Sequence, residues 1–354
     1  MSELTSFADL EIKVKHRQWV NAFKNAFAVL SMASPGHVVC IVGPSRVGKT
    51  KIVRELKAHL DNGNNYAETG LLPVVSVEAV NAGPNGTFST KAFTQRLLEA
   101  VRHPMLSMEG SDEFSVMAGH RVERTTESTL RLALERAFMR RGCRYLFIDE
   151  AQHARYASKQ SQAPHAVMDS WKCLAQTSGL VLVLVGAYPI LEVLRNSPHM
   201  LGRKTQIHLS RYGDSKEDVV EFARIISAFE RAMGSYVETN FLVKHASFLH
   251  ERTCGCIGLL KGCLKQALTI AQAHSQVIDI SLLEASTMSD SDLLEISREI
   301  AEGERLLFSS PRDPCEPKSK PAQTVVSKPK KKGEGPFRRK PVRYKPGHRI
   351  GDES

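Results

Sequence analysis

Long hydrophobic runs are missing from this 354-residue sequence. The longest clean apolar stretches, such as Leu180–Val185, fall far below the roughly 18 residues that a membrane span needs. The N-terminal stretch opens with acidic and polar residues and contains no apolar segment typical of a secretory signal. We therefore expect a protein of the cytoplasm that has no membrane partner.

Paired cysteines are also missing. The seven cysteines include no CxxC pair, and an odd number without regular spacing is typical of reduced thiols. Cys254-Gly-Cys256 leaves zinc as an alternative, but two ligands without a second pair make a poor site. Buried cysteines that act as small hydrophobic residues are the favoured interpretation.

Net positive charge is small over most of the chain and is concentrated in residues 309–354. The sequence has 48 Lys and Arg against 38 Asp and Glu, a net charge of +10. Residues 309–354 hold 13 of these basic residues, only 5 acidic ones and eight of the sixteen prolines. This composition predicts a nearly neutral globular body of about two domains, followed by a basic, Pro-rich, disordered tail.

The order of apolar segments predicts a parallel α/β sheet. Short strand patterns alternate with helical patterns up to about residue 213, and only helical patterns follow. We therefore predict an α/β domain followed by a small all-helical domain. The predicted regions are a lead-in helix at 1–36, the α/β domain at 37–213, the helical domain at 214–308 and the tail at 309–354.

A phosphate-binding loop follows the first strand pattern. Gly43–Thr50 satisfies GxxxxGK[ST], with an apolar strand before it and a helix after it. In such a loop backbone N–H groups surround the phosphates, Lys49 neutralises the β- and γ-phosphates, and Thr50 binds Mg²⁺. An ordinary strand–turn–helix is the alternative. The predicted nucleotide contacts are Gly43, Pro44, Ser45, Arg46, Val47, Gly48, Lys49, Thr50 and Lys51.

An acidic pair ends the third strand pattern. Asp149 and Glu150 follow the apolar residues Tyr145–Ile148. A carboxylate at the carboxyl edge of a sheet lies beside the phosphate loop, so Asp149 is predicted to hold Mg²⁺ and Glu150 to polarise the attacking water. A helix N-cap is the alternative for the pair. Together the motifs predict an ATPase with ATP and Mg²⁺ as cofactors.

Three classes of P-loop protein compete for this pattern. A small-molecule kinase requires an acceptor pocket, which no motif marks. A two-lobe helicase fits Asp149-Glu-Ala-Gln152 but requires a second α/β lobe, whereas residues 213–308 show only helical patterns. An AAA+ ATPase, with an α/β domain and a small helical lid, fits the whole layout.

Several blocks resemble the TniB/TnsC family of AAA+ transposition regulators over roughly residues 10–275. The resemblance is carried by the lead-in helix with His16 and by five blocks: CIVGPSRVGKT (40–50), VNAGPNGTFSTKAF (80–93), YLFIDEAQH (145–153), LVLVGAYP (182–189) and GCIGLLKGCLKQAL (255–268). Two residues depart from the family pattern. Arg46 replaces a glycine, and Ala187 stands where a polar sensor is common, which affects the expected hydrolysis rate more than ATP binding.

The resemblance implies a ring or helical oligomer with ATP between subunits. A neighbour's arginine then reaches the γ-phosphate, with Arg203 preferred over Arg195. Lys261, after Gly258, is a candidate sensor in the same subunit. Ordinary surface charges are the alternative for these residues. His153 is interpreted as a packed histidine and Trp171 as a core residue.

The resemblance also implies partners. These are double-stranded DNA without sequence preference, transposase subunits and a TniQ-type targeting adaptor, in a bacterial cytoplasm. Lys91, Arg121 and Arg124 are the candidate phosphate contacts. The tail, with Lys328–Lys332 and Phe337–Lys340, is a candidate contact for DNA or a transposase subunit, or merely solubilising. The alternative function is an AAA+ helicase loader or DNA motor.

Overall fold

The computed structural model of the chain describes residues 16–104, 124–157, 163–195 and 204–308. The chain divides into two compact units, Met1–Ser309 and Ser310–Ser354, and all the described residues lie in the first. The predicted basic tail lies outside the described residues.

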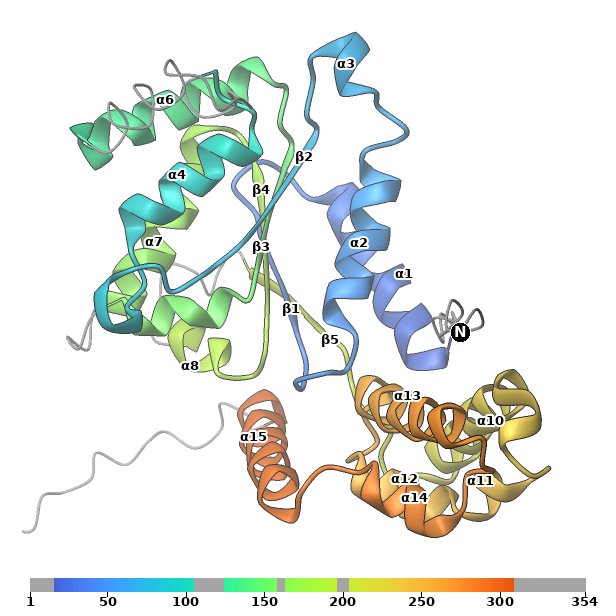
Figure 1. Cartoon of the computed structure of the whole chain (residues 1–354). Helices are drawn as coiled ribbons and strands as arrows, with labels where there is room; N and C mark the ends of the chain where they lie inside the picture. The colour runs from blue at the N-terminus through green and yellow to red at the C-terminus, as the bar shows by residue number, and fades with distance from the viewer. Residues whose placement is uncertain (1–15, 105–123, 158–162, 196–203, 309–354) are drawn as a thin grey trace, which may run out of the picture. The chain divides into compact units, whose positions relative to one another are not determined.

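Five parallel strands form one sheet in the order β2-β3-β4-β1-β5 (Figure 1). Their bounds are β1 Val38–Val42, β2 Val74–Glu78, β3 Tyr145–Asp149, β4 Val181–Gly186 and β5 Lys204–His208. Strand β1 is fully buried, and its alternate side chains enter different clusters, with Val38 and Cys40 on one face and Val39 and Ile41 on the other. Burial on both faces explains why this strand is a continuous apolar run rather than an alternating one.

Helices cover both faces of the sheet. Helices α1 (Arg17–Met32) and α2 (Lys49–Leu60) lie on one face, and α4 (Thr90–Ala100), α6 (Glu127–Arg140) and α7 (Ala163–Thr177) lie on the other (Figure 1). Shorter elements are α3 Tyr66–Thr69, α8 Ile190–Arg195 and the 3₁₀ turns η1 Pro84–Gly86, η2 Ala151–Tyr156 and η3 Gly234–Tyr236. The predicted parallel α/β fold is thereby confirmed.

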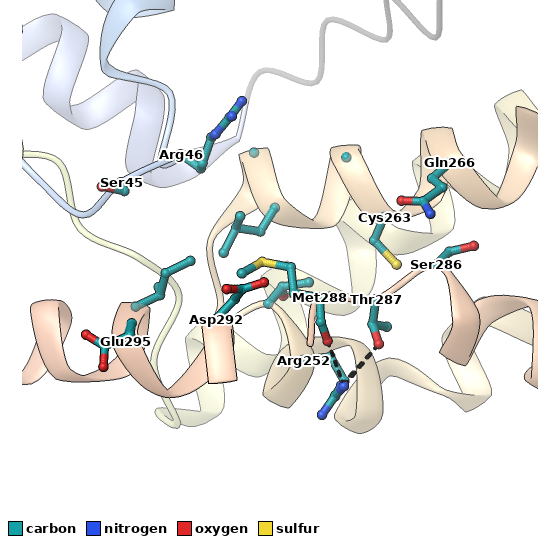
Figure 2. Close-up of a pocket in the computed structure, with 15 residues that line it drawn as sticks. Ser45, Arg46, Arg252, Cys263, Gln266, Ser286, Thr287, Met288, Asp292 and Glu295 are labelled. Carbon is teal, nitrogen blue, oxygen red and sulfur yellow. Dashed lines mark hydrogen bonds between the residues drawn. The ribbon is translucent and has the colours of Figure 1, made fainter. Parts of the chain in front are cut away.

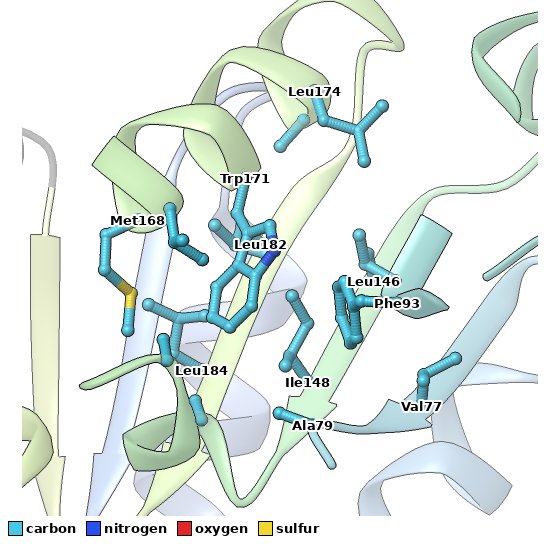
Figure 3. Close-up of a cluster of buried hydrophobic side chains, with 14 of the residues drawn as sticks. Val77, Ala79, Phe93, Leu146, Ile148, Met168, Trp171, Leu174, Leu182 and Leu184 are labelled. Carbon is cyan, nitrogen blue, oxygen red and sulfur yellow. The ribbon is translucent and has the colours of Figure 1, made fainter. Parts of the chain in front are cut away.

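Aromatic side chains fill the core under α4 and α7. Trp171 is 4% exposed, and its ring lies 5.1 Å from Phe93 and 5.8 Å from Phe88 between centroids (Figure 3). Leu182 and Leu184 of β4 contribute to the same cluster. Burying such large rings stabilises the sheet by roughly 2–3 kcal/mol for each side chain, and Trp171 is a core residue as the sequence predicts.

His16 caps helix α1 and links it to Tyr212, which follows strand β5. Its Nδ1 accepts from the backbone N–H of Trp19 at 3.4 Å and lies 3.0 Å from the hydroxyl of Tyr212. Burial, assisted by the charge of Lys51, lowers the pKa of His16 to about 4. The ring is therefore neutral, with Nδ1 as the acceptor.

Only helices follow β5 among the described residues. They are α10 Lys216–Met233, α11 Phe241–Lys244, α12 Ala246–Arg252, α13 Ile257–His274, α14 Ile280–Ala285 and α15 Asp290–Phe308. The apolar pattern of residues 239–251 predicts one helix. That prediction is wrong, because the chain turns at His245, where φ is −96° and ψ is 18°, and divides the segment into α11 and α12. Helices α10 to α14 share a separate core that includes Phe222, Phe229 and Leu264.

No single helix in the described ranges is long and apolar enough to cross a bilayer. Helices α12 and α13 pass that test of length and composition only as a pair, and the pair is bent by 112°.

Candidate nucleotide-binding site

The phosphate loop connects β1 directly to α2. Strand β1 ends at Val42, and α2 begins at Lys49, so Gly43–Gly48 form the turn at the carboxyl edge of the sheet. Gly48 has a φ of 109°, a conformation that side chains rarely adopt. Arg46 has a φ of 62°, which is also left-handed. An arginine there carries a backbone strain of about 1 kcal/mol.

Lys49 is held inside its own loop. Its side chain is 7% exposed, and Nζ donates to the carbonyl oxygens of Gly43 at 3.1 Å and Pro44 at 2.9 Å. Burial lowers the pKa of Lys49, and the charges of Glu150, Glu299 and Asp149 oppose that shift. The two carbonyl oxygens that hold this buried ammonium carry no full negative charge. Phosphate oxygens do, so the ammonium can exchange the carbonyls for them.

Asp149 and Thr50 lie in contact at the end of β3. The Thr50 hydroxyl donates to the Asp149 carboxylate, which also accepts from the backbone N–H of Glu150 at 2.9 Å. Burial raises the pKa of Asp149, while these two hydrogen bonds oppose the shift. The two residues predicted to bind Mg²⁺ are therefore adjacent, and a hydroxyl and a carboxylate are oxygen ligands of the kind that this ion prefers.

Glu150 occupies a strained position beside Asp149. Its φ is 52° and its ψ is 34°, a left-handed conformation that is uncommon for a residue other than glycine. Glu150 precedes η2, but its side chain makes no capping hydrogen bond. The carboxylate instead accepts from the side-chain amide of Gln152, whose oxygen accepts from the backbone N–H of Ala187 at 3.1 Å. This arrangement differs from the N-cap alternative.

Helix α13 rests directly on the phosphate loop. A Cβ added at Gly258 would lie 2.0 Å from the carbonyl oxygen of Arg46, so only glycine permits this approach. Ser45 and Arg46 line a cavity of about 640 Å³ together with residues of α13 and α15, including Gln266, Asp292 and Glu295 (Figure 2). Lys261 is partly buried one turn into α13 but does not line this cavity.

Helix α15 also contacts the loop. The Ser45 hydroxyl donates to both carboxylate oxygens of Glu299, at 3.0 and 3.2 Å. Further along the helix, a Cβ at Gly303 would lie 2.0 Å from Cγ of Tyr188, which follows β4. Arg195, one of the two candidate arginines, donates to the carbonyl of Leu306. Three turns of α15 thus contact segments that surround the loop.

The other predicted site residues fall into three groups. Arg121 and Arg203 lie outside the described residues. Lys51 is exposed in the first turn of α2. Lys91 lies at the start of α4, and Arg124 lies just before α6. The starts of these two helices are joined by a hydrogen bond of 2.9 Å between the side chains of Thr90 and Glu127. The Nδ1 of His153 donates to the carbonyl of Ala79 at 2.7 Å, the contact of a packed side chain.

The cysteine pair has no metal-binding neighbours in the described part of the chain, where no group of three or more His, Cys, Asp or Glu could hold a metal ion. The Cys254 thiol lies 3.3 Å from the Ser297 hydroxyl. Cys256 is fully buried, and burial raises its pKa to about 12.

Three residues of the site were not predicted from the sequence. Gln152 was read only as part of a helicase-like motif, Gly258 only as a resemblance, and Glu299 not at all. Gln152 had a local signal, since it follows the acidic pair by two residues. Glu299 had none, because its contact with Ser45 spans 254 positions.

Comparisons with known proteins find a domain family and solved structures of similar fold. Residues 33–194 match the family model of the AAA domain. The solved Aeropyrum pernix ORC2 protein, in its ADPNP-ADP complexes, superposes with a TM-score of 0.53 at 15% identity, covering 81% of this chain and 71% of that chain. A Walker-type ATPase of Pyrococcus abyssi gives 0.49 at 15% identity, covering 80% and 73%. A search of curated protein sequences found no match.

The fold, the loop geometry and the family match define the class of protein. The chain carries a P-loop nucleotide domain of the AAA+ type, with the sheet order, phosphate loop and acidic pair described above. It is an ATPase of this class and a nucleotide-binding protein.

Proposed function

We propose that this protein is a regulator of DNA transposition, of the kind that the TniB/TnsC resemblance implies. In this proposal ATP binding assembles subunits into a ring or helical filament on duplex DNA, and hydrolysis dissolves it. The assembly links a TniQ-type targeting adaptor to transposase subunits. The observation that carries the proposal is the phosphate loop placed between the acidic pair and the lid helix α13.

The chain's own residues have clear chemical tasks in hydrolysis. Lys49 exchanges its loop carbonyls for the β- and γ-phosphates, and Glu150 polarises the attacking water as a general base. Thr50 and Asp149 are the residues that would hold Mg²⁺. The ion, when bound, neutralises phosphate charge. Burial of Lys49 strengthens its electrostatic contacts.

A neighbouring subunit supplies an arginine in this proposal. Such an arginine stabilises charge that develops in the transition state and is worth about 10³–10⁵ in rate. Arg203 is the preferred candidate and Arg195 the alternative. Because Arg195 donates to Leu306 of α15 in this structure, it must leave that contact before it can reach another subunit's nucleotide.

DNA binding is proposed to be electrostatic and without sequence preference. Lys91 and Arg124 lie near the joined starts of two neighbouring helices, and Arg121 belongs to the same stretch of sequence. Contacts to phosphates carry no sequence information and weaken as salt rises. The basic tail, residues 309–354, is proposed as an additional contact for DNA or a transposase subunit.

The test is electron microscopy of the full chain with duplex DNA, with and without ATP. We expect regular assemblies on DNA only with ATP for the wild type and none for Lys49→Ala. Lys24→Ala, which changes an exposed lysine of α1, is the control and should assemble normally. Failure of the wild type to assemble on DNA would refute the proposal, and ATP-driven strand displacement would favour a DNA motor.

A further inference from the structure

We propose that Gln152 is a positioning residue for ATP hydrolysis, which orients the Glu150 carboxylate and replaces the polar side chain that strand β4 lacks at Ala187. This inference rests on the role proposed above for Glu150 as the general base. It adds a residue that fixes where the base points, and it explains how hydrolysis proceeds with alanine at that position.

The sheet order brings the relevant groups to one place. Strand β4 lies between β1, which leads to the phosphate loop, and β3, which leads to the acidic pair. Gly186 pairs with Val42, and Ile148 pairs with Leu184. The end of β4 therefore lies between the strand that leads to the phosphate loop and the strand that leads to Glu150.

Hydrogen-bonding chemistry allows Gln152 only one orientation. The backbone N–H of Ala187 can only donate, so the amide oxygen of Gln152 must face β4. The amide nitrogen is then directed at Glu150, whose ionised carboxylate can only accept. Because both neighbours agree, the amide is fixed at both ends, and a donor is aimed at the predicted base.

The backbone at Gly186 and in η2 leaves room for the contact between Gln152 and Ala187 and holds Gln152 in place. A Cβ at Gly186 would lie 2.4 Å from the amide oxygen of Gln152, so a larger residue at the end of β4 would displace it. Gln152 itself lies in η2, which is anchored by the hydrogen bonds from His153 to Glu150 and to Ala79, at 3.0 and 2.7 Å. The glutamine is thus attached to a rigid turn.

The contact has a specific consequence for the reaction. A carboxylate on a residue with a strained backbone has several accessible rotamers, and only some of them reach the attacking water. The amide of Gln152 restricts that choice and connects the base to the end of β4. Its loss should slow the chemical step and leave ATP binding, which depends on Gly43–Thr50, unchanged.

The experiment compares steady-state hydrolysis and nucleotide affinity in full-length variants. Gln152→Ala should lower kcat by about 10–100-fold, a fraction of the 10²–10⁴ typical of a positioned base, with KM within about twofold of wild type. Gln152→Glu has nearly the same shape but cannot donate when ionised and repels Glu150, so its kcat should fall at least as far. Gln276→Ala, at an exposed glutamine that follows α13 and lies outside the cavity beside Ser45 and Arg46, is the control.

Two further variants test the structural argument. Gly186→Ala should reproduce the loss of kcat because its Cβ displaces the Gln152 amide. Adding Ala187→Asn to Gln152→Ala restores a polar side chain at the end of β4 and should recover part of kcat. Affinity for a fluorescent, non-hydrolysable ATP analogue, measured separately, should stay within about twofold for every Gln152 variant.

The outcomes separate this inference from the proposal beneath it. If Glu150→Gln retains wild-type turnover, the base role of Glu150 is wrong. If Glu150→Gln stops turnover but Gln152→Glu has a wild-type or higher kcat, the positioning role of Gln152 is wrong. A higher KM or weaker analogue binding with unchanged kcat would also overturn it, because the residue would then act in binding.

Discussion

The phosphate loop and helix α15 lie on two sides of the same site, but the chain encodes them in different ways. Eight consecutive residues, Gly43–Thr50, contain the loop's backbone conformation and its lysine. Helix α15 reaches the site through single side chains placed about 250 residues later, such as Glu299 against Ser45. The residues of the phosphate loop are neighbours in the sequence, whereas the residues of α15 that cover the site lie far from them in the sequence.

The largest effect is expected from a substitution at Gly258, where helix α13 contacts the phosphate loop. Gly258→Ala places a Cβ 2.0 Å from a backbone oxygen of the loop, which cannot rotate away. We expect a loss of about 3 kcal/mol in the free energy of unfolding, the upper range for an overpacked contact, and weaker ATP binding. Urea denaturation and titration with a fluorescent ATP analogue measure the two effects.

The matched control for that variant lies one turn further along the same helix. Gly262→Ala adds a Cβ that meets no atom within 4 Å, so it should stabilise α13 by about 0.5–1 kcal/mol. Equal stability and equal ATP affinity in Gly258→Ala and Gly262→Ala would show that the contact of Gly258 with Arg46 affects neither property.

The pH dependence of stability tests a second long-range contact, between His16 and Tyr212. Burial lowers the pKa of His16 to about 4, below its value of 6.5 in the unfolded chain. Between pH 6.5 and pH 4 the unfolded chain binds a proton that the folded state excludes, so stability is lost as pH falls. The expected loss from pH 7 to pH 5 is about 2 kcal/mol.

Urea denaturation at both pH values measures this loss. His16→Gln keeps a polar side chain without a titrating group, and it should make the loss between pH 7 and pH 5 smaller by the same amount. A pH dependence that is identical in the variant would assign the effect to other groups.

A substitution at Glu299 is expected to have a smaller effect, on the affinity for ATP. Its carboxylate accepts from Ser45 and acts electrostatically on Lys49, so it stands near the place of a bound phosphate. Glu299→Gln removes that negative charge, and we expect ATP affinity to rise about fivefold, or about 1 kcal/mol, for a partly exposed charge. Glu302→Gln, on the exposed part of α15, should change affinity little. A weaker affinity in Glu299→Gln would show that α15 supports the bound nucleotide.

The smallest expected effect concerns the loop alone. Arg46 has a left-handed φ of 62°, which glycine adopts without strain. Arg46→Gly should therefore raise the free energy of unfolding by about 0.5 kcal/mol at most, because the relief of about 1 kcal/mol of strain is largely offset by the greater freedom of glycine in the unfolded chain. Thermal denaturation by circular dichroism measures it, and a lower Tm would mean that the arginine side chain contributes a stabilising contact.

The sequence predicted the elements that carry their own signal. Its patterns predict a helix from Lys49 to about Leu60 and strands at 37–42, 73–80, 145–148, 180–185 and 205–210. Helix α2 spans Lys49–Leu60, and each strand lies within two residues of these bounds, because apolar runs and turn residues are local. Helices α8 and α14 were missed because each has only six residues, too few to show a helical period. The break at His245 was missed because no glycine or proline marks it.

The candidate site divides in the same way. Lys49, Thr50, Asp149 and Glu150 were predicted from motifs, and the fold places them at one edge of the sheet. The contacts of Gln152 with Ala187 and of Gly258 with Arg46 depend on which strand lies beside which and on how closely a helix approaches. Neither property is visible in one sequence, since both arise from packing between distant segments.

The pairing of β1 has a consequence for the synthesis of the protein. Both hydrogen-bonded neighbours of β1, β4 and β5, begin about 140 residues or more after β1 ends. A ribosome that adds about 5–20 residues per second needs about 7–28 seconds to cover that distance. During this time the nascent chain contains the complete phosphate-loop motif but no sheet to hold it. ATP therefore becomes a ligand, and a stabiliser of the newborn chain, only after β4 has emerged.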